Sequence, residues 1–391
     1  MFENLLAPEI QEFIRENSGQ NPSSLALKKN PFPGNDWQAI ISQIAAREKA
    51  KDKLPTWYDA ENIIYPSKIS VEQTSSETTA QFKAKLVSGE NLIDLTGGFG
   101  VDDQYFAKVV NHVTHCELNP ELSAIAAHNF KILGADNITC ITGDSFETLK
   151  NSGQKWDWIY IDPSRRSDAK GKVFMLKDCL PNVPELLDIY LTYSNNILIK
   201  TAPILDISAG FSELSYVKSV YIVALNNEVK ELLWHIERGF NDEPALHSIN
   251  LEKGRTDSFT APLQSDAVVH YANPLKYLYE PNAAIMKSGA FAEVAEQFDV
   301  KKLHPHSHLY TSDMIIDFPG RRFEVQQVIP YSKKEMKEFI QAKKMNVTVR
   351  NFPQTVEDIR KKWKISDGGE TYTFFTTRMN NEKIVVLCAK I

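Results

Sequence analysis

Apolar and polar positions in the middle of the chain follow two alternating patterns. Short runs rich in apolar residues at 92–94, 113–116, 138–142 and 158–161 are bounded by residues that favour turns. Between these runs, as over 104–110, apolar residues recur at a spacing of three or four. The runs are typical of buried strands, and the spacing is typical of amphipathic helices. The pattern therefore predicts an α/β domain in which strands and helices alternate.

The same alternation continues as far as residue 252, so we expect the sheet domain to span residues 86–252. Its later strands are predicted at 196–200, 216–225 and 247–251, and its later helices at 176–190 and 228–236.

The segment before the sheet domain, residues 1–85, is predicted to be helical. Apolar residues have helical spacing at 5–14 and 37–46, and turn-rich stretches separate these two helices. Thr74 and Glu77 stand at the spacing of a capping box, which predicts a further helix that runs towards position 87. We expect this segment to form a lid or a docking module.

The pattern changes after the sheet domain. We predict a connecting region at 253–320, either ferredoxin-like or a linker, and a smaller α+β module at 321–391. The elements expected in the module are strands at 322–329 and 347–350, helices capped by Ser332 and Thr355, and a closing hairpin of 372–377 with 384–389.

Composition and charge limit the kind of protein. The chain has 391 residues, enough for two or three domains, and a formal net charge of −6 at pH 7. Residues 251–391 hold 21 Lys and Arg against 17 Asp and Glu, so a phosphate-binding surface is expected in this basic part. The 4 cysteines have no paired spacing, and the chain shows neither a signal-peptide pattern nor a membrane-length apolar run. We expect a cytoplasmic enzyme.

The candidate chemistry begins at the end of the first predicted strand. The loop Leu95-Thr96-Gly97-Gly98-Phe99-Gly100 follows that strand directly, and Glu117 ends the next strand. Glycines at these positions allow a tight turn and a close approach of the backbone to a ligand. A carboxylate at the end of the second strand can accept hydrogen bonds from both ribose hydroxyls of an adenosine. The spacing therefore predicts a nucleoside cofactor.

A nicotinamide dinucleotide is the competing interpretation, because dehydrogenases use the same turn and the same acidic residue. The loop lacks the third glycine, however, and Asp102 and Asp103 stand where a pyrophosphate would meet the helix N-terminus. These carboxylates would repel phosphate. Asp94 and Asp102 would instead attract the sulfonium and ammonium groups of S-adenosylmethionine, which we predict as the cofactor. A turn that only joins a strand to a helix is the plainer alternative.

Two further strand ends supply polar residues. Asp144 follows the third strand, where its side chain could accept a hydrogen bond from the adenine amine, cap the next helix, or do both. Asp162 and Pro163 follow the fourth strand, and the carboxyl ends of strands carry the active sites of open α/β sheets. An amine conjugated with a ring is a poor nucleophile, so acceptors such as these could hold its hydrogens and aim its lone pair at the methyl group. A strand-ending turn is the alternative.

The order of the glycine loop, Glu117, Asp144 and Asp162-Pro163 resembles the class I S-adenosylmethionine-dependent methyltransferases. The resemblance implies a Rossmann-like seven-stranded sheet, mostly parallel with an antiparallel edge. In the amino-methylating branch of the family, Asp or Asn, then Pro-Pro and an aromatic residue, occupies the place of 162–165. Ser164 and Arg165 depart from that pattern.

The resemblance also bears on the substrate. The loop at 94–102 is similar to that of bacterial ribosomal-RNA guanine-N2 methyltransferases, and the C-terminal module resembles the THUMP-like domain of some bacterial methyltransferases. The residues expected to bind the cofactor are Asp94, Thr96, Gly97, Gly98, Gly100, Asp102, Glu117, Leu118, Asp144 and Ser145. The expected catalytic residues are Asp162, Pro163 and Ser164.

These observations favour a methyltransferase that acts on an exocyclic base amine, with guanine N2 as one target, in ribosomal or transfer RNA. Methylation of a small molecule or protein, and a binding protein without turnover, are the alternatives. Arg165 and Arg166 are expected to hold substrate phosphates, with a solvated basic loop as the alternative. The candidate RNA contacts of the C-terminal module, or a solvated helix face, are Arg360, Lys361, Lys362 and Lys364.

One motif suggests a metal, because His304, His306 and His308 alternate as ligands on one face of a strand can. Neither a cysteine nor a carboxylate pattern completes a site near them, and methyl transfer needs no metal. We expect no metal, and interpret the motif as a turn with exposed imidazoles.

Overall fold

The computed structural model describes residues 2–165, 175–340 and 344–391 of the chain. The chain forms two compact units. The first comprises Met1–Lys218 and Leu232–Asp242, and the second comprises Ser219–Glu231 and Glu243–Ile391.

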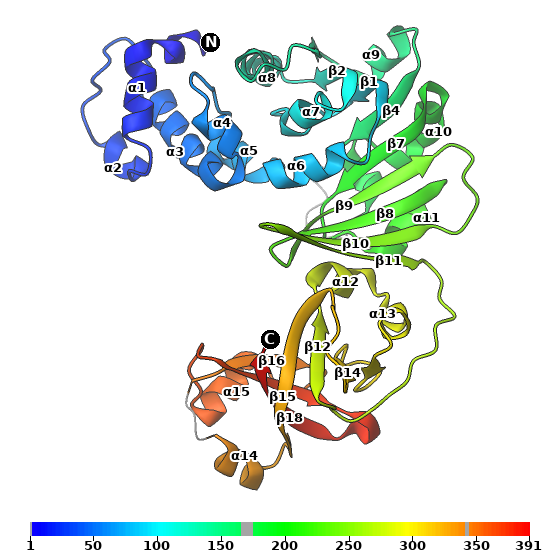
Figure 1. The fold of residues 1–391 in the computed structure, drawn as a ribbon. Coiled ribbons are helices and arrows are strands. Elements are labelled where there is room, and N and C mark those ends of the chain that lie inside the picture. Colours follow the sequence, from blue (N-terminus) through cyan, green and yellow to red (C-terminus); the bar gives the residue numbers. More distant parts are fainter. Residues whose placement is uncertain (1, 166–174, 341–343) are drawn as a thin grey trace. The chain divides into compact units, whose positions relative to one another are not determined.

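The larger sheet has nine strands in the order β11-β10-β8-β9-β7-β4-β1-β2-β3 (Figure 1). Pairing is parallel from β7 through β4, β1 and β2 to β3, and antiparallel between β7 and β9. At the other edge, β10 pairs parallel with β8 and antiparallel with β11. The strands are β1 Gly89–Asp94, β2 Val110–Glu117, β3 Ile138–Thr142, β4 Trp156–Ile161, β7 Ser194–Thr201, β8 Val217–Leu225, β9 Glu228–Glu237, β10 Ala245–Glu252 and β11 Arg255–Pro262.

The predicted α/β class and Rossmann-like sheet are confirmed, but the sheet has nine strands rather than seven. The segment predicted as a helix at 228–236 is the strand β9, so that prediction was wrong. This strand lies inside the sheet, and its residues 231–234 are all buried. Its apolar residues 232–234 are consecutive, and periodicity cannot distinguish a short apolar run in a buried strand from a buried helix. Asn226 and Asn227 have positive φ angles of 51° and 63°, as a tight hairpin turn before such a strand requires.

The described helices of this domain have 6 to 13 residues. They are α7 Val101–Phe106, α8 Pro120–Ile132, α9 Ser145–Asn151, α10 Val183–Tyr193 and α11 Ile207–Glu213. The helix predicted at 176–190 was wrong in its first half, which contains the 3-10 turn η3 Leu176–Asp178 and the short strand β6 Cys179–Leu180. Pro181 and Pro184 explain the difference, because proline interrupts a helix interior but is tolerated in the first turn, where Pro184 lies.

The N-terminal segment is helical, as predicted. It contains η1 Glu3–Leu6, α1 Pro8–Glu16, α2 Pro22–Ala26, α3 Trp37–Lys53, α4 Pro55–Asp59, α5 Lys68–Gln73 and α6 Glu77–Ala84. The cap of α6 differs from the predicted capping box. The hydroxyl of Ser76, and not that of Thr74, accepts the hydrogen bond from the N–H of Thr79. The carboxylate of Glu77 instead accepts hydrogen bonds from the backbone N–H and hydroxyl of Thr56.

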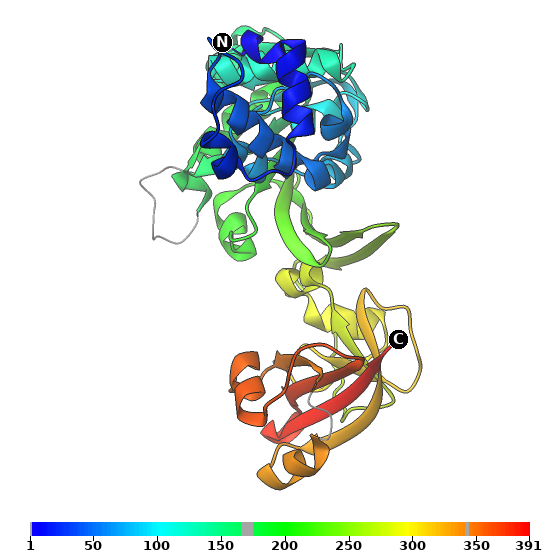
Figure 2. The same ribbon diagram turned by 90° about the vertical axis from the view of Figure 1, so that its left-hand side faces the viewer.

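This segment contacts the sheet domain within the first unit, and Figure 2 draws its helices in blue in front of the cyan part of the chain. The Asn129 side chain of α8 accepts a hydrogen bond from the N–H of Ile64 and donates one to its carbonyl, at 3.0 and 2.8 Å. The ring of Trp57, which is fully buried, lies 4.5 Å from the ring of Phe99 in the glycine loop. The N-terminal segment therefore supports the loop from one side.

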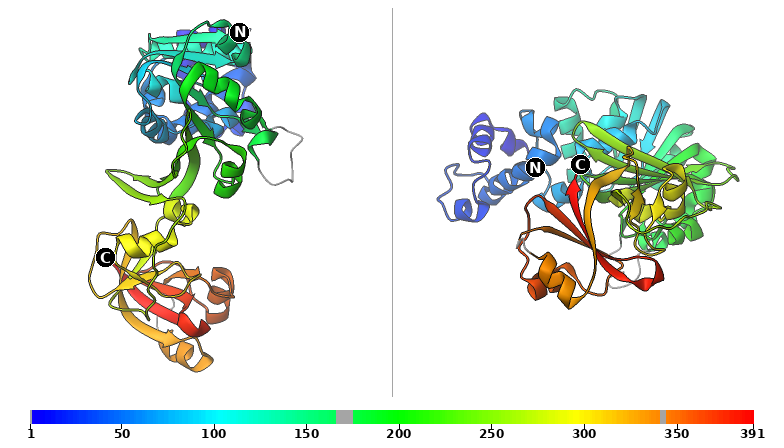
Figure 3. Two further views of the ribbon diagram at one scale, coloured as in Figure 1. Left: turned by 90° about the vertical axis from the view of Figure 1, so that its right-hand side faces the viewer. Right: turned by 60° about the horizontal axis from the view of Figure 1, so that its bottom comes forward.

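The second sheet has seven strands in the order β13-β14-β12-β15-β18-β17-β16. Its strands are β12 Tyr277–Pro281, β13 Lys301–Lys302, β14 Tyr310–Ser312, β15 Gly320–Pro330, β16 Asn346–Arg350, β17 Thr371–Thr377 and β18 Lys383–Lys390. Its helices are α12 Ala283–Ser288, α13 Phe291–Gln297, α14 Lys333–Phe339 and α15 Val356–Trp363, with the 3-10 turn η4 Met379–Asn381. The predicted closing hairpin is β17 with β18, drawn in red in Figure 3.

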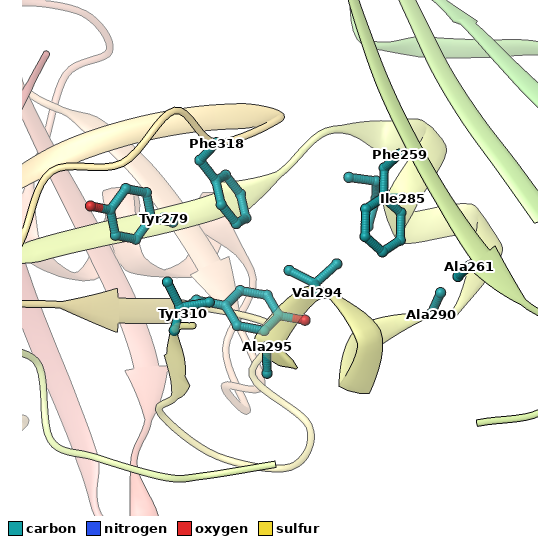
Figure 4. Close-up of a cluster of buried hydrophobic side chains, with 10 residues drawn as sticks. Phe259, Ala261, Tyr279, Ile285, Ala290, Val294, Ala295, Tyr310 and Phe318 are labelled. Carbon is teal, nitrogen blue, oxygen red and sulfur yellow. The ribbon is translucent and has the colours of Figure 1, made fainter. Parts of the chain in front are cut away.

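The two parts predicted after the sheet domain share this sheet, because β12 pairs with β15. A cluster of buried side chains fills the space beside β12, including Tyr279, Val294, Tyr310 and Phe318 (Figure 4). All four side chains are fully buried, so the region before position 320 has a packed core. It is a folded part of the second unit rather than a flexible linker.

The histidine motif has a structural role in this unit. His304 is 9% exposed, so the prediction of an exposed imidazole was wrong for this residue. Its Nδ1 accepts from the Asn351 amide and the His306 N–H, and its Nε2 lies 3.2 Å from the Asn381 side-chain oxygen. A neutral imidazole protonated on Nε2 satisfies all three contacts and joins three loops. Among the described residues, no group of three or more His, Cys, Asp or Glu is arranged to hold a metal.

Candidate active site

The glycine loop follows β1, and its backbone lies close to side chains of the neighbouring elements. A Cβ atom on Gly97 would lie 2.3 Å from the ring of His115, which is fully buried below the loop. Gly100 has a φ of +84°, and a Cβ atom there would lie 2.3 Å from the ring of Phe130. Both positions therefore require glycine, the first for space and the second for space and conformation.

Glu117 ends β2 and faces this loop. One carboxylate oxygen, Oε2, accepts a hydrogen bond of 2.9 Å from the N–H of Gly98, and the other accepts one of 2.7 Å from the N–H of Asn119. A carboxylate oxygen has two lone pairs, so each retains capacity for a ribose hydroxyl. The next residue, Leu118, is 74% exposed. An apolar side chain left in solvent beside this carboxylate suits the face of an adenine, so the residues fit the predicted nucleoside.

A buried polar network lies beneath the loop. The Asp94 carboxylate accepts hydrogen bonds from the N–H and hydroxyl of Thr96, at 2.7 and 2.9 Å. The Asp103 carboxylate lies 2.5 Å from Nδ1 of His115. Burial raises the pKa of Asp94 and of Asp103, and the charge of a neighbouring aspartate adds to both effects. Burial also lowers the pKa of His115, so the network favours neutral groups.

Asp102 is held by three side chains of the first unit. Its carboxylate accepts hydrogen bonds from Ser75 and Tyr160, at 2.9 and 2.8 Å, and forms an ion pair of 3.2 Å with Lys83. Burial acts to raise the pKa of Asp102, but Lys83, Lys200 and the two hydroxyls outweigh it, so the pKa is lowered and the group is ionised. Asp102 thus joins α6 to the helix after the loop, and its contact with the cofactor stays a prediction.

Asp144 and Ser145 follow β3 at the start of α9. The Asp144 carboxylate accepts hydrogen bonds of 2.8 and 3.2 Å from the N–H groups of Phe146 and Glu147, so it is the N-cap of that helix. Both bonds use the oxygen Oδ1. The side chain is exposed, and Oδ2 remains available for an adenine amine. The capping and cofactor interpretations are therefore compatible.

Asp162 follows β4, beside the glycine loop. Its backbone N–H donates a hydrogen bond of 2.7 Å to the hydroxyl of Thr96, and its Oδ2 forms an ion pair with Nζ of Lys200. Pro163 is buried, whereas Ser164 is exposed and begins the short strand β5 Ser164–Arg165. The predicted catalytic residues thus lie at the carboxyl end of the sheet, next to the predicted cofactor loop.

Lys200 is a residue of this site that the sequence reasoning missed. It lies near the end of β7, the strand that pairs with β4, and Ile199 is the register partner of Ile161. The signal was present, because a lysine near the end of the strand predicted at 196–200 lies at the edge that carries active sites. The sequence did not show that this strand lies beside β4 in the sheet.

The predicted substrate-binding arginines are only partly described. The backbone of Arg165 belongs to β5, where it pairs with Cys179 of β6. Arg166 lies outside the described residues. Their contacts with a substrate stay predictions.

The chain was compared with known proteins and families. A crystal structure of a candidate methyltransferase from Porphyromonas gingivalis W83 matches 99% of this chain and 98% of its own chain, with a TM-score of 0.90 and 31% sequence identity. The chain belongs to this methyltransferase family. Family models also match three segments: an RNA cap guanine-N2 methyltransferase at 89–166, a ferredoxin-like domain at 277–319 and a THUMP domain-like segment at 320–390.

These matches confirm the predictions of a methyltransferase, of S-adenosylmethionine as its cofactor and of the THUMP-like module. TrmK from M. capricolum, solved with S-adenosyl-homocysteine, matches 44% of this chain and 71% of its own, with 17% identity and a TM-score of 0.33. The candidate methyltransferase yhhF from Escherichia coli matches 41% of this chain and 84% of its own, with 17% identity and a TM-score of 0.31. No curated protein sequence matches this methyltransferase. Among its described residues, no helix is both long and apolar enough to cross a membrane.

Proposed function

We propose that this methyltransferase transfers a methyl group to an exocyclic base amine in RNA, with guanine N2 as the first target to test. The observation that carries the proposal is the position of Asp162 and Pro163 at the end of β4, beside the glycine loop. The match of 89–166 to the RNA cap guanine-N2 methyltransferase model covers the loop and this strand end, and supports an amine. The THUMP domain-like segment at 320–390 supports RNA, ribosomal or transfer, as the substrate.

The residues of the site can align an amine. The carboxylate of Asp162 and the carbonyl of Pro163 are two acceptors on consecutive residues, and each can hold one hydrogen of an –NH₂ group. With both hydrogens held, the nitrogen lone pair is turned away from the ring and towards the cofactor side. Thr96 fixes the backbone of Asp162, so the acceptors have a defined position relative to the loop.

The cofactor is held by the loop and by the two following strand ends. Glu117 would accept the ribose hydroxyls, Leu118 would cover the adenine face, and Asp144 would accept from the adenine amine. Bound S-adenosylmethionine supplies a methyl carbon made electrophilic by its positively charged sulfur. The reaction is a direct displacement, so the main task of this chain is alignment. We expect the enzyme to work in the cytoplasm, where RNA substrates are present.

Transfer of a labelled methyl group tests the proposal. RNA and protein extracted from cells that lack the enzyme would be incubated with labelled S-adenosylmethionine, and the modified nucleoside identified by mass spectrometry. We expect label in RNA, in a base methylated on its exocyclic amine. Asp162→Ala should abolish the transfer, whereas Asp136→Ala, which removes an exposed carboxylate outside the site, should not.

The other outcomes decide between the alternatives. Label in protein, or in a small-molecule fraction, would replace RNA as the substrate class. Binding of the cofactor without transfer to any fraction would identify a binding protein. Ser164 and Arg165 are the reason to test for this outcome, because they depart from the amino-methylating pattern.

A further inference from the structure

Four aspartates at or beneath the predicted methyl-transfer site are each paired with a lysine or buried, which limits their capacity to neutralise a substrate cation in addition to the cofactor. Asp162 forms an ion pair with Lys200, and Asp102 forms one with Lys83. Asp94 and Asp103 are buried in the network beneath the loop, where burial raises the pKa of each and favours the uncharged acid. These four aspartates therefore provide hydrogen-bond acceptors without an unbalanced negative charge.

Lys200 is built into the sheet at this point. It follows Ile199, the register partner of Ile161, and so stands beside Asp162 on the neighbouring parallel strand. The Lys200 side chain is 13% exposed, and that of Asp162 is 40% exposed. The lysine is thus held by the protein, while the carboxylate that it contacts faces the site. Lys200 also acts on Asp102, so its charge is shared between two aspartates.

This arrangement has a consequence for the acceptor. An alkyl amine, such as a protein lysine or a polyamine, is protonated near neutral pH, because the pKa of a lysine amine is about 10.4. It would bring a third positive charge to a site that already contains Lys200 and the cofactor sulfonium. A site for such a substrate would need a carboxylate with unbalanced charge. An amine conjugated with a base is neutral and needs only acceptors.

We propose that Lys200 is a positioning residue which, by balancing the charge of Asp162, restricts this site to acceptor amines that are neutral near pH 7 and excludes alkylammonium groups. This inference rests on the proposed function. The nitrogen lone pair forms the new N–C bond while the C–S bond breaks, and its electron pair stays on sulfur as a neutral thioether. The nitrogen then releases one proton to water, which removes the charge that it gained.

Lys200 also fixes the direction of Asp162. The Lys200 ammonium binds Oδ2 of Asp162, so Oδ1 is the oxygen that can accept one N–H of the amine. The second N–H then goes to the carbonyl of Pro163. Loss of Lys200 would leave the carboxylate free to rotate and with an unbalanced charge, which should lower the rate with a neutral amine and favour binding of a cation.

Three variants test this inference. Lys200→Met removes the charge at similar length, and Lys200→Arg keeps it. Lys218→Met is the matched control, because Lys218 also forms an ion pair, with Glu237, but lies near the amino end of β8. Each variant would be assayed with RNA from cells that lack the enzyme and with a lysine-rich peptide. Circular dichroism and the affinity for S-adenosyl-homocysteine would confirm that the first unit is folded.

We expect Lys200→Met to lower kcat on RNA about 100-fold, as misalignment of a reacting group does, while KM and the affinity for S-adenosyl-homocysteine change by less than about threefold. The ratio of peptide to RNA methylation should rise. Lys200→Arg should recover activity to within about tenfold of the unmodified enzyme, and Lys218→Met should match it. A merely structural lysine would alter folding or affinity and leave this ratio unchanged.

The possible failures are distinguishable. If the unmodified enzyme methylates RNA but Lys200→Met changes neither kcat nor the ratio, this inference is overturned and the proposed function stands. If the unmodified enzyme prefers the lysine-rich peptide, both are overturned. If it methylates neither substrate while it binds S-adenosyl-homocysteine, both are overturned.

Discussion

The hydroxyl of Thr96 accepts a hydrogen bond of 2.7 Å from the backbone N–H of Asp162. The same hydroxyl donates to the carboxylate of Asp94, at 2.9 Å. A side chain of the glycine loop therefore joins the end of β1 to the end of β4. It couples the predicted cofactor loop to the predicted catalytic residue, and one substitution can test the coupling.

Thr96→Val removes both hydrogen bonds with little change of shape. The N–H of Asp162 and the Asp94 carboxylate each lose a partner, so we expect the free energy of unfolding to fall by about 1–3 kcal/mol. The kcat should fall about tenfold, because Asp162 is no longer fixed relative to the loop. Urea unfolding and single-turnover assays provide the two measurements. Thr96→Ser keeps the hydroxyl and should stay close to the unmodified enzyme, so equal losses in both variants would contradict the explanation.

The contact between Gly97 and His115 predicts a steric effect on the cofactor. In Gly97→Ala the added Cβ would lie 2.3 Å from the imidazole, so the loop must shift. We expect the affinity for S-adenosyl-homocysteine to fall at least tenfold, with a loss of about 1–3 kcal/mol in stability from overpacking. Calorimetric titration measures the affinity. The double variant with His115→Ala, which opens space below the loop, should recover part of it, and strict additivity of the two losses would exclude a direct clash.

A substitution at Leu118 can test cofactor binding without changing the stability of the protein. Its side chain is 74% exposed, so Leu118→Ala removes almost no packing within the protein and should leave the unfolding transition unchanged. If it covers the adenine, the substitution removes apolar contact from the complex, and the affinity for S-adenosyl-homocysteine should fall about tenfold. Ile189→Ala, an apolar residue that is 40% exposed on α10, is the control. Unchanged affinity in Leu118→Ala would remove this residue from the cofactor site.

His235 predicts how stability depends on pH. Burial, with a smaller effect of Lys218, lowers the pKa of His235 to about 4, from an ordinary value of 6.5. Its ring packs 4.9 Å from that of Trp158 in the interior of the sheet. Between pH 6.5 and 4 the unfolded chain binds a proton here that the folded chain does not. The contribution of His235 to the free energy of unfolding is therefore fully present above pH 6.5 and is lost as the pH falls towards 4.

The midpoints of urea unfolding at pH 7 and pH 5 test the direction of this pH dependence. The midpoint should be lower at pH 5, and the decrease should be smaller in His235→Gln, which cannot bind the proton. His270→Gln replaces an exposed histidine and should retain the full decrease. A decrease in His235→Gln as large as in the unmodified enzyme would assign the pH dependence to other groups.

Much of the site could be predicted because its parts are local in the sequence. The glycine loop, Glu117, Asp144 and Asp162 each follow a short apolar run, and a run of that kind ends where a strand ends. The turn residues and the strand before them are therefore determined within about ten positions. The parallel order of the strands then brings those ends to one edge of the sheet.

The strand β9 shows where local patterns fail. Its buried residues, 231–234, form a run without alternation, so nothing in the sequence selects a strand over a helix. The choice depends on β7 and β8, which flank β9 along its two edges and supply its backbone partners, and this is a property of the assembled sheet. The N-cap of α6 failed for a related reason, because Glu77 is recruited by Thr56, 21 residues earlier in the chain, rather than by its own helix.

The sequence by itself determined which chemical groups stand at the strand ends, since backbone preferences and turn residues act over a few neighbouring positions. Only the tertiary structure decided which charges meet. Lys200 and Asp162 are 38 residues apart, and they form a pair because β7 lies beside β4. An electrostatic contact depends on distance in space and not on separation along the chain, so the balance of charge at this site appears only when the sheet is assembled.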